Sequence, residues 1–198
     1  MDKLKVKIFV EDLAQENIIK ALFVRVCREA GLASDRLEVD VPYSRGGGSI
    51  KALNAYLRDF GAEVADCFVL GSDGNCKGFS EKRKMLEKQF HDHPVEHKLI
   101  FAVPDPHVER WYLVDATALS QAVGCTVAAH PPQHKCDKGF YKKQLKSAIS
   151  SSGVIPGQGG AEYGGDVAWG MDIFKSGKQD NGFRVFCDEV RAWAIRNK

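Results

Sequence analysis

The sequence lacks a long apolar segment. No uncharged hydrophobic run approaches the roughly 18–20 residues that a helix needs to cross a bilayer. The N-terminus, MDKLKVKIFVEDL, has neither an uncharged apolar stretch nor a small-residue cleavage site of the kind found in signal peptides. We therefore expect a cytoplasmic protein with no membrane partner.

Other common signatures are also missing. The six cysteines are scattered, and without an export signal they are expected to be reduced thiols. There is no Walker A sequence, and no G-x-G-x-x-G follows the first predicted strand, which disfavours a small-molecule nucleotide-binding protein. The net charge of +2 does not by itself indicate a nucleic-acid partner.

The length and the composition allow one sizeable domain. The chain has 198 residues, of which 44% are hydrophobic and 27% are charged, as in ordinary soluble globular proteins. In the first half, strand patterns alternate with helix patterns, which is typical of parallel βαβ units. The expected strands are 4–10, 37–41, 64–70 and 98–103, and the expected helices are 13–30, 49–60 and 80–90.

The second half is predicted to be helical. Short helices are expected after Pro104 and over 138–150, and two helices are expected between 166 and 196, with a break at SGKQDNG. Gly31 and Ser49 are predicted to cap helices. The predicted organisation is an α/β core over 1–115 and a helical C-terminal extension, 116–198, packed on it. Three tryptophans are expected to anchor the helices in the core: Trp111, Trp169 and Trp193.

Acidic residues follow three of the predicted strands. Glu11 ends the first strand, Asp73 follows the third, and Asp105 and Glu109 follow the fourth with a spacing that fits one helical face. The carboxyl ends of parallel strands form one rim, where ligands bind. Mg²⁺ prefers oxygen ligands of this kind, although acids at these places can also be simple helix caps.

A family resemblance appears in these same segments. The stretch IFVEDLAQENIIKALF is similar to the opening strand and helix of the Toprim domain of topoisomerases, primases and overcoming-lysogenisation-defect type nucleases. GSDGN stands at the place of the Toprim Asp-x-Asp motif. AVPDPHVERWYLVDATAL and GGAEYGGDVAWGMDI resemble a family of small bacterial Toprim-like proteins. The resemblance implies a Rossmann-like Toprim fold with a mostly parallel sheet.

The resemblance also implies roles for particular residues. Glu11 matches the glutamate proposed as metal ligand or general base, and Asp73 matches the second aspartate of the pair. Gly71 stands where the first aspartate is expected. Glu16 matches a second acid found in the nuclease branch and is a candidate metal ligand. Asp105 and Glu109 stand where that branch can have acids for a second metal.

The function implied is a nuclease that depends on Mg²⁺ or Mn²⁺. It would cleave phosphodiester bonds of nucleic acid, as the nuclease halves of bacterial antiviral defence systems do together with a separate ATPase. Gly71 favours an alternative, a catalytically impaired module that binds nucleic acid or a protein partner. The sequence leaves open whether the chain forms a homo-oligomer.

Basic residues and glycines near the predicted rim are candidates for phosphate binding. The loop RGGGS leads into a helix N-terminus, where backbone amides bind phosphate, and a basic helix follows Asp73. A flexible loop and a solvated helix face are the alternatives. The candidates are Arg45, Gly47, Gly48, Lys77, Lys82 and Arg83, with a second basic surface at Lys138, Tyr141, Lys142, Lys143 and Lys146.

Two clusters of histidine or cysteine are interpreted as structural. HDHPVEH, which contains His91, is interpreted as a polar connection between a helix and a strand. CTVAAHPPQHKC has no compact zinc-finger spacing and is interpreted as an irregular linker.

Overall fold

The computed structural model describes residues 3–42, 47–128, 136–137 and 139–198. Some candidate residues from the sequence lie outside these ranges: Arg45, Lys138, and the two histidines of CTVAAHPPQHKC, His130 and His134.

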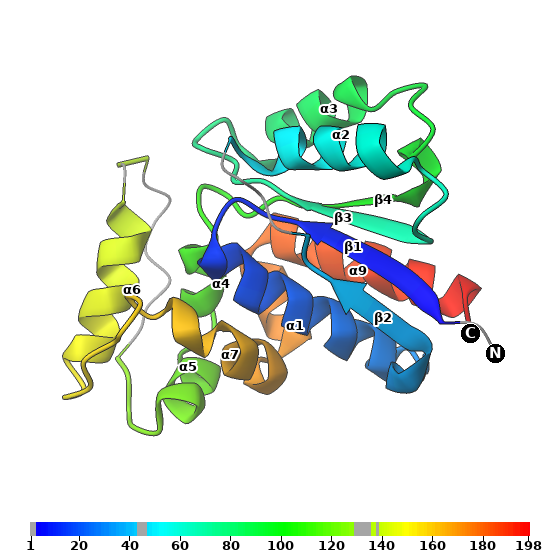
Figure 1. Cartoon of the computed structure of the whole chain (residues 1–198). Coiled ribbons are helices and arrows are strands. Elements are labelled where there is room, and N and C mark those ends of the chain that lie inside the picture. The colour runs from blue at the N-terminus through cyan, green and yellow to red at the C-terminus, as the bar shows by residue number, and fades with distance from the viewer. Residues whose placement is uncertain (1–2, 43–46, 129–135, 138) are drawn as a thin grey trace.

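Four parallel strands form the centre of the fold (Figure 1). They are β1 (Leu4–Phe9), β2 (Leu37–Asp40), β3 (Cys67–Gly71) and β4 (Leu99–Ala102), in the order β2-β1-β3-β4. All three neighbouring pairs are parallel. This confirms the predicted α/β class with a parallel, Rossmann-like sheet.

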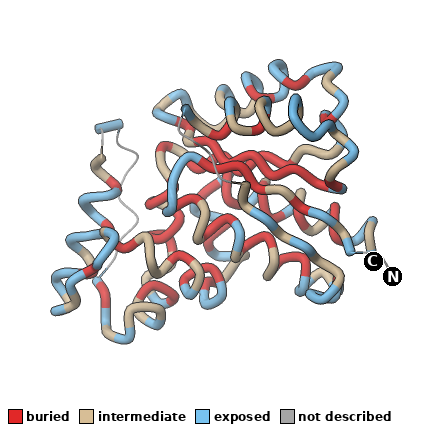
Figure 2. The backbone as a smooth tube through the Cα atoms, viewed as in Figure 1, coloured by how far each residue is buried: buried red, intermediate tan, exposed pale blue. Residues whose placement is uncertain are grey.

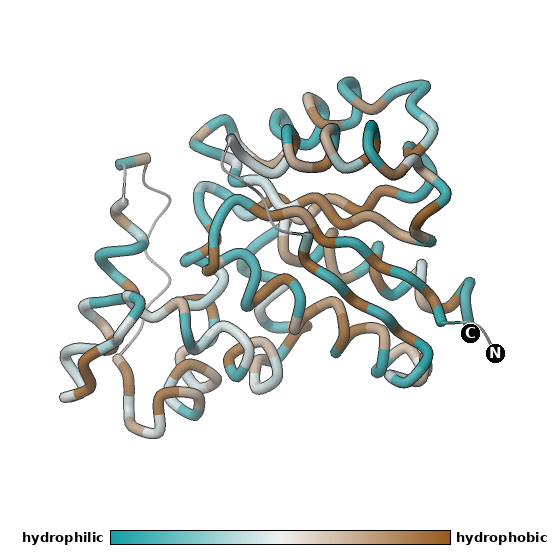
Figure 3. The backbone as a smooth tube through the Cα atoms, in the orientation of Figure 1, coloured by the Kyte–Doolittle hydropathy of each residue, from teal (hydrophilic) through white to brown (hydrophobic). Residues whose placement is uncertain are grey.

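β3 is buried along its whole length because it lies between β1 and β4 and has helices on both faces. Its residues alternate between two hydrophobic clusters: Val69 packs on the side of α1 (Leu13–Glu29), whereas Phe68 and Leu70 pack on the other side. Figures 2 and 3 show the central part of the sheet as buried and hydrophobic, with hydrophilic residues on the outer helices, whereas the edge strand β2 is only half-buried to exposed.

Helices cover both faces of the sheet. α2 (Ser49–Phe60) and α3 (Phe79–Gln89) lie on one face, and α1 with α9 (Asn181–Arg196) lies on the other (Figure 1). α9 contacts both β4 and α1. One hydrophobic cluster extends from β1 to α9, so the C-terminal helices complete the core of the α/β unit.

In the described ranges, five further α-helices stand between β4 and α9. α4 (Glu109–Leu113) and α5 (Ala116–Val123) follow the sheet, and α7 (Gly164–Gly170) packs on α1 and α5. α8 (Ile173–Gln179) precedes and contacts α9. α6 (Phe140–Ser150) stands on the side of the carboxyl ends of the strands and contacts α4 (Figure 1).

The tail contains three helices where two were expected. Asp172 and Asp180 each accept a hydrogen bond from a backbone amide three residues ahead, at Lys175 and Phe183. These two caps start α8 and α9, so most of the predicted break at SGKQDNG is helical. The prediction overlooked both N-caps.

Other local predictions are also corrected. Gly48 is the N-cap of α2, and the Ser49 side chain makes no capping bond. Gly31 ends α1 as predicted: it follows the C-cap residue Ala30 with a φ of +88°, and its amide donates to the carbonyl oxygen of Arg28 (2.9 Å). Trp111 and Trp193 are buried as expected, but Trp169 is 44% exposed, and the Arg28 guanidinium lies 5.9 Å from its ring centre. No helix in the described ranges is long and apolar enough to span a membrane.

The packing of α9 on the sheet gives a testable prediction. A Cβ added to Gly182 would lie 2.2 Å from the carbonyl oxygen of Val103, so Gly182→Ala must separate α9 from the end of β4. We expect it to lower the free energy of unfolding by roughly 1–3 kcal/mol or more, measured by urea denaturation. Gly165→Ala is the control, because open space surrounds that position in α7 and alanine favours helix by about 0.5–1 kcal/mol. Equal losses in the two variants would contradict the close contact.

Candidate metal centre at the strand ends

The loops that follow β3 and β4 are joined by backbone hydrogen bonds. The amide of Ser72 donates to the carbonyl oxygen of Ala102 (3.0 Å), that of Gly74 to Pro104 (2.7 Å), and that of Asn75 to Pro106 (3.0 Å). The parallel pairing of the two strands thus continues beyond the sheet. It holds the segment around Asp73 against the segment that leads to His107.

Gln15 connects the acids that follow β1 and β3. Its side-chain oxygen accepts a hydrogen bond from the amide of Glu11 (3.0 Å), and its Nε2 donates to Oδ1 of Asp73 (2.8 Å). The hydroxyl of Ser72 donates to Oε1 of Glu11 (2.7 Å). Glu11 and Asp73 therefore lie in one hydrogen-bonded network, as the sequence predicted from their places after neighbouring strands.

Gly71 leaves no room for the aspartate that the resemblance led us to expect there. A Cβ at this position would lie 2.9 Å from Cδ1 of Ile19, 3.0 Å from Oε1 of Gln15 and 3.1 Å from Cγ1 of Val10. The position therefore points into the interface between β3 and α1, where the Gln15 side chain is 1% exposed. The side-chain amide of Gln15, which donates a hydrogen bond to Asp73, lies where an aspartate side chain at position 71 would begin.

His107 is a site residue that the sequence analysis missed. Its Nδ1 lies 2.9 Å from Oδ2 of Asp73, so the Asp73 carboxylate is held between the imidazole on one oxygen and Gln15 on the other. The hydrogen bond to Asp73 raises the pKa of His107, and burial opposes this shift. Its position between Asp105 and Glu109 was the signal available in the sequence.

The strand-end carboxylates affect one another electrostatically. Partial withdrawal from water raises the pKa of Glu11, although the residue as a whole is exposed, and the negative charge of Asp73 adds to this rise. The Ser72 hydrogen bond and the charge of Lys82 act in the opposite direction. Burial also raises the pKa of Glu109, again with a contribution from Asp73. Such shifts mark a cluster with excess negative charge.

The Asp105 side chain contacts the start of α3 and the loop that follows β3. Its Oδ2 accepts a hydrogen bond from the amide of Phe79 at the start of α3 (3.2 Å), and its side chain lies against Gly74, where a Cβ would approach Oδ1 to 2.7 Å. Since α4 begins at Glu109, Asp105 does not share a helical face with that residue. The predicted pairing of these two acids on one helix is therefore wrong.

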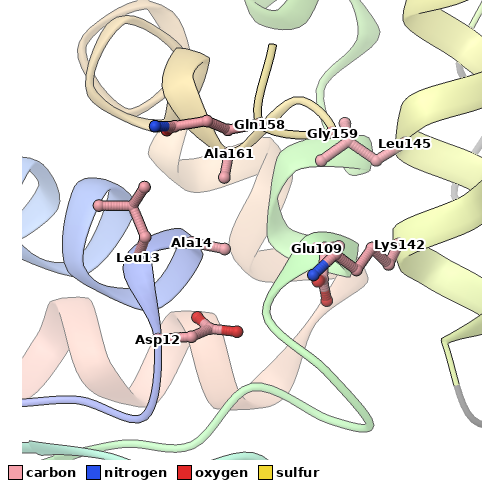
Figure 4. A pocket seen from close by; sticks show the side chains of 9 residues that line it. All are labelled: Asp12, Leu13, Ala14, Glu109, Lys142, Leu145, Gln158, Gly159 and Ala161. Atoms are coloured by element: carbon pink, nitrogen blue, oxygen red, sulfur yellow. The ribbon is translucent and has the colours of Figure 1, made fainter. Parts of the chain in front are cut away.

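Glu109 lines a cavity of about 220 Å³ beside the strand ends (Figure 4). The cavity lies between the start of α1, α4, α6 and the segment that precedes α7. Figure 4 shows Asp12, Glu109 and Lys142 around this space. Glu16, by contrast, lines a separate groove with Asn17 and Trp169, and no hydrogen bond within the described ranges joins its side chain to the other acids.

The candidate phosphate-binding residues have different environments. Lys77 is exposed, and Lys82 lies close enough to Glu11 to lower the pKa of that carboxyl. Gly47 and Gly48 have positive φ angles at the start of α2. Arg83 is occupied elsewhere: it forms two hydrogen bonds with Glu189 (2.6 and 3.0 Å), which joins α3 to α9. This removes the main reason for placing Arg83 among the phosphate contacts.

A different group has the closest spacing of metal-ligand atoms. Among the described residues, His91, Asp92 and Glu96 are the one set of three whose ligand atoms all lie within 4.8 Å of one another. All three are exposed, and they lie in the connection that leads into the amino end of β4, at the opposite edge of the sheet. No three of the strand-end acids in the described ranges meet this spacing, so an ion at Glu11 and Asp73 would take its other ligands from water and substrate oxygens.

Comparisons with protein-family models, with curated proteins and with solved structures found no match to this chain.

The contact between Asp73 and His107 can be tested by titration. In the absence of divalent ions, we expect Asp73→Asn to lower the pKa of His107, because it removes the charged acceptor that raises this pKa. NMR of the imidazole measures the shift, and Asp35→Asn, at an exposed acid in another part of the fold, serves as the control. An unchanged His107 titration would contradict the contact.

The same pair has a defined effect on stability. Because the folded-state pKa of His107 is raised, its protonated form stabilises the fold. This contribution is fully present below the pKa of an unfolded histidine and is lost as the pH rises through the folded-state pKa.

The packing around Gly71 gives a further prediction. We expect Gly71→Asp to lower the unfolding midpoint and to create no additional metal site, because the new side chain would meet Ile19 and Val10. Thermal unfolding and Mn²⁺ titration measure the two effects. A stable Gly71→Asp protein that binds Mn²⁺ more tightly would contradict the packing argument.

Proposed function

We propose that this protein is a divalent-metal-dependent phosphodiesterase that acts on nucleic acid. The observation that carries the proposal is the position of Asp73, whose two oxygens face Gln15 and His107. Burial raises the pKa of both Glu11 and Glu109, and the charge of Asp73 adds to each rise. Carboxylates that repel one another in this way at the carboxyl edge of a parallel sheet favour a bound cation.

The donor set suits Mg²⁺ or Mn²⁺. Glu11 and Asp73 offer hard oxygen ligands from two adjacent strands, and one or two carboxylates completed by water and phosphate oxygens are the usual Mg²⁺ site. Such an ion polarises the phosphate and lowers the pKa of a bound water. No thiol in the described ranges is hydrogen-bonded to Glu11 or Asp73, and the raised pKa of His107 favours its protonated form, which does not bind metal.

Two side chains are placed to move protons. Glu11, oriented by the Ser72 hydroxyl, can accept a proton from an attacking water through a carboxylate oxygen that does not bind the ion. His107, oriented by Asp73 and with a raised pKa, can donate a proton to the leaving oxygen. Gln15 is a positioning residue, because it acts through Asp73.

Lysines flank these acids. Lys77 and Lys82 lie at the start of α3, and Lys142, Lys143 and Lys146 lie on α6, which stands on the same side of the sheet. Cations on both sides of the rim suit a phosphate backbone that passes across it. A separate ATPase partner, and a role in antiviral defence, rest on the Toprim resemblance described above.

The second candidate function is a nucleic-acid-binding or protein-binding module without catalysis. The arrangement at Gly71 favours it, since a neutral amide takes the space of one acid. In this case Asp73 would hold a single weakly bound ion or none.

The two functions can be separated by cleavage assays with Mg²⁺ or Mn²⁺. The substrates are supercoiled DNA, single-stranded DNA and RNA. We expect Asp73→Asn and Glu11→Gln to reduce cleavage by roughly 10²–10⁴-fold, because they remove a ligand and the proposed base. Glu38→Gln is the matched control, because this exposed carboxylate on the edge strand β2 lies outside the network.

Metal binding is measured on the same proteins by calorimetry with Mn²⁺. Weak Mn²⁺ binding or none by the wild type, without cleavage of any substrate, would favour the binding module. Equal cleavage by the wild type and both site variants would overturn the nuclease proposal.

A further inference from the structure

The Glu109 side chain is a buried carboxylate that lines a cavity. The residue is 8% exposed, and within the described ranges its carboxylate has no hydrogen bond or ion pair with another residue; it accepts a hydrogen bond from its own backbone amide, and Asp73, Asp12 and His107 act on it only through their charges. A buried acid is ordinarily paired, because burial without a partner costs free energy. Here the acid faces a cavity instead (Figure 4), which indicates a ligand that donates hydrogen bonds.

The cavity has the size and the lining of a site for one ring system. Its volume of about 220 Å³ is below the roughly 300–1,000 Å³ of pockets for drug-sized ligands, so it suits a fragment such as a nucleobase. Leu13 and Leu145 give apolar contact on opposite sides, from α1 and α6, and Gln158 offers an amide at the rim. A buried carboxylate between apolar side chains can orient a flat ring that donates hydrogen bonds.

The cavity also lies next to the proposed reaction site. Asp12, which lines it, directly follows Glu11, and the charge of Asp73 is close enough to raise the pKa of Glu109. Lys142, on the α6 side, offers a cation at the cavity wall (Figure 4). A nucleotide with its phosphate at the strand ends can therefore place its base beside Glu109.

We propose that this cavity binds one unpaired nucleobase that carries an exocyclic amino group. Adenine, cytosine and guanine present amino N–H donors to a carboxylate, whereas uracil and thymine place two carbonyl oxygens beside their single ring N–H and repel it. A base within a duplex cannot enter such a cavity without leaving the stack, so the preferred substrate is single-stranded. This inference rests on the proposed function for the position of the phosphate and specifies its substrate class.

Binding of short labelled homopolymers, measured by fluorescence anisotropy in the presence of a chelator, tests the proposal without cleavage. We expect the wild type to bind oligo(A) and oligo(C) about tenfold more tightly than oligo(U), as one charge-assisted contact would give. Glu109→Gln should reduce this preference to about twofold or less. Leu145→Trp should weaken the binding of oligo(A) and oligo(C) to the affinity of oligo(U), because the indole ring fills the cavity.

Two controls separate the cavity from general effects. Glu38→Gln makes the same chemical change at an exposed position, and Leu145→Met keeps the volume of the side chain; both should retain the preference. Unfolding midpoints are measured for Glu109→Gln and Leu145→Trp. If one of the two has lost its fold, the other decides the test.

Several outcomes would overturn the inference. Equal binding of the three homopolymers by the wild type, or an unchanged preference in Glu109→Gln, would do so. Binding of spermidine that depends on Glu109, without any base preference, would assign the cavity to a small cation instead. Base preference in a protein that cleaves no substrate would contradict the nuclease proposal and support the base-binding cavity. Cleavage without base preference would support the nuclease proposal and contradict the base-binding cavity.

Discussion

The close packing of β3 on α1 at Gly71 is the constraint on which the candidate site depends. Because this position has no side chain, Gln15 reaches between the two strands and contacts the backbone of Glu11 and the carboxylate of Asp73. The same contact removes one acid from the rim and orients another. The metal centre that we propose therefore has fewer carboxylates than the resemblance implies, and each of them is held by a named donor.

The loops beyond the sheet extend this constraint to the other side of the site. The continued backbone pairing after β3 and β4 places His107 against Asp73, and Asp105 ties the same loop to the start of α3. The backbone thus holds the strand-end carboxylates close to one another despite their mutual repulsion. A cation and a protonated imidazole are the two charges that relieve it.

The C-terminal helices belong both to the core and to the site. α9 covers the sheet beside α1, and Asp180 caps it while accepting a hydrogen bond from the indole of Trp111 in α4 (3.2 Å). α6 stands over the strand ends and closes one wall of the cavity beside Glu109. A nucleic-acid substrate would therefore meet surfaces from both halves of the chain.

Periodicity and strand-end chemistry in the sequence were enough to predict the parallel sheet, most helix positions and the places of Glu11 and Asp73, because these depend on local patterns and on the shared edge of parallel strands. Three features could not be predicted in this way. The burial of Gln15, the pairing of His107 with Asp73 and the unpartnered carboxylate of Glu109 each arise where segments distant in sequence meet. Only the tertiary structure decides such contacts, because hydrogen bonding and burial depend on neighbours that no local pattern specifies.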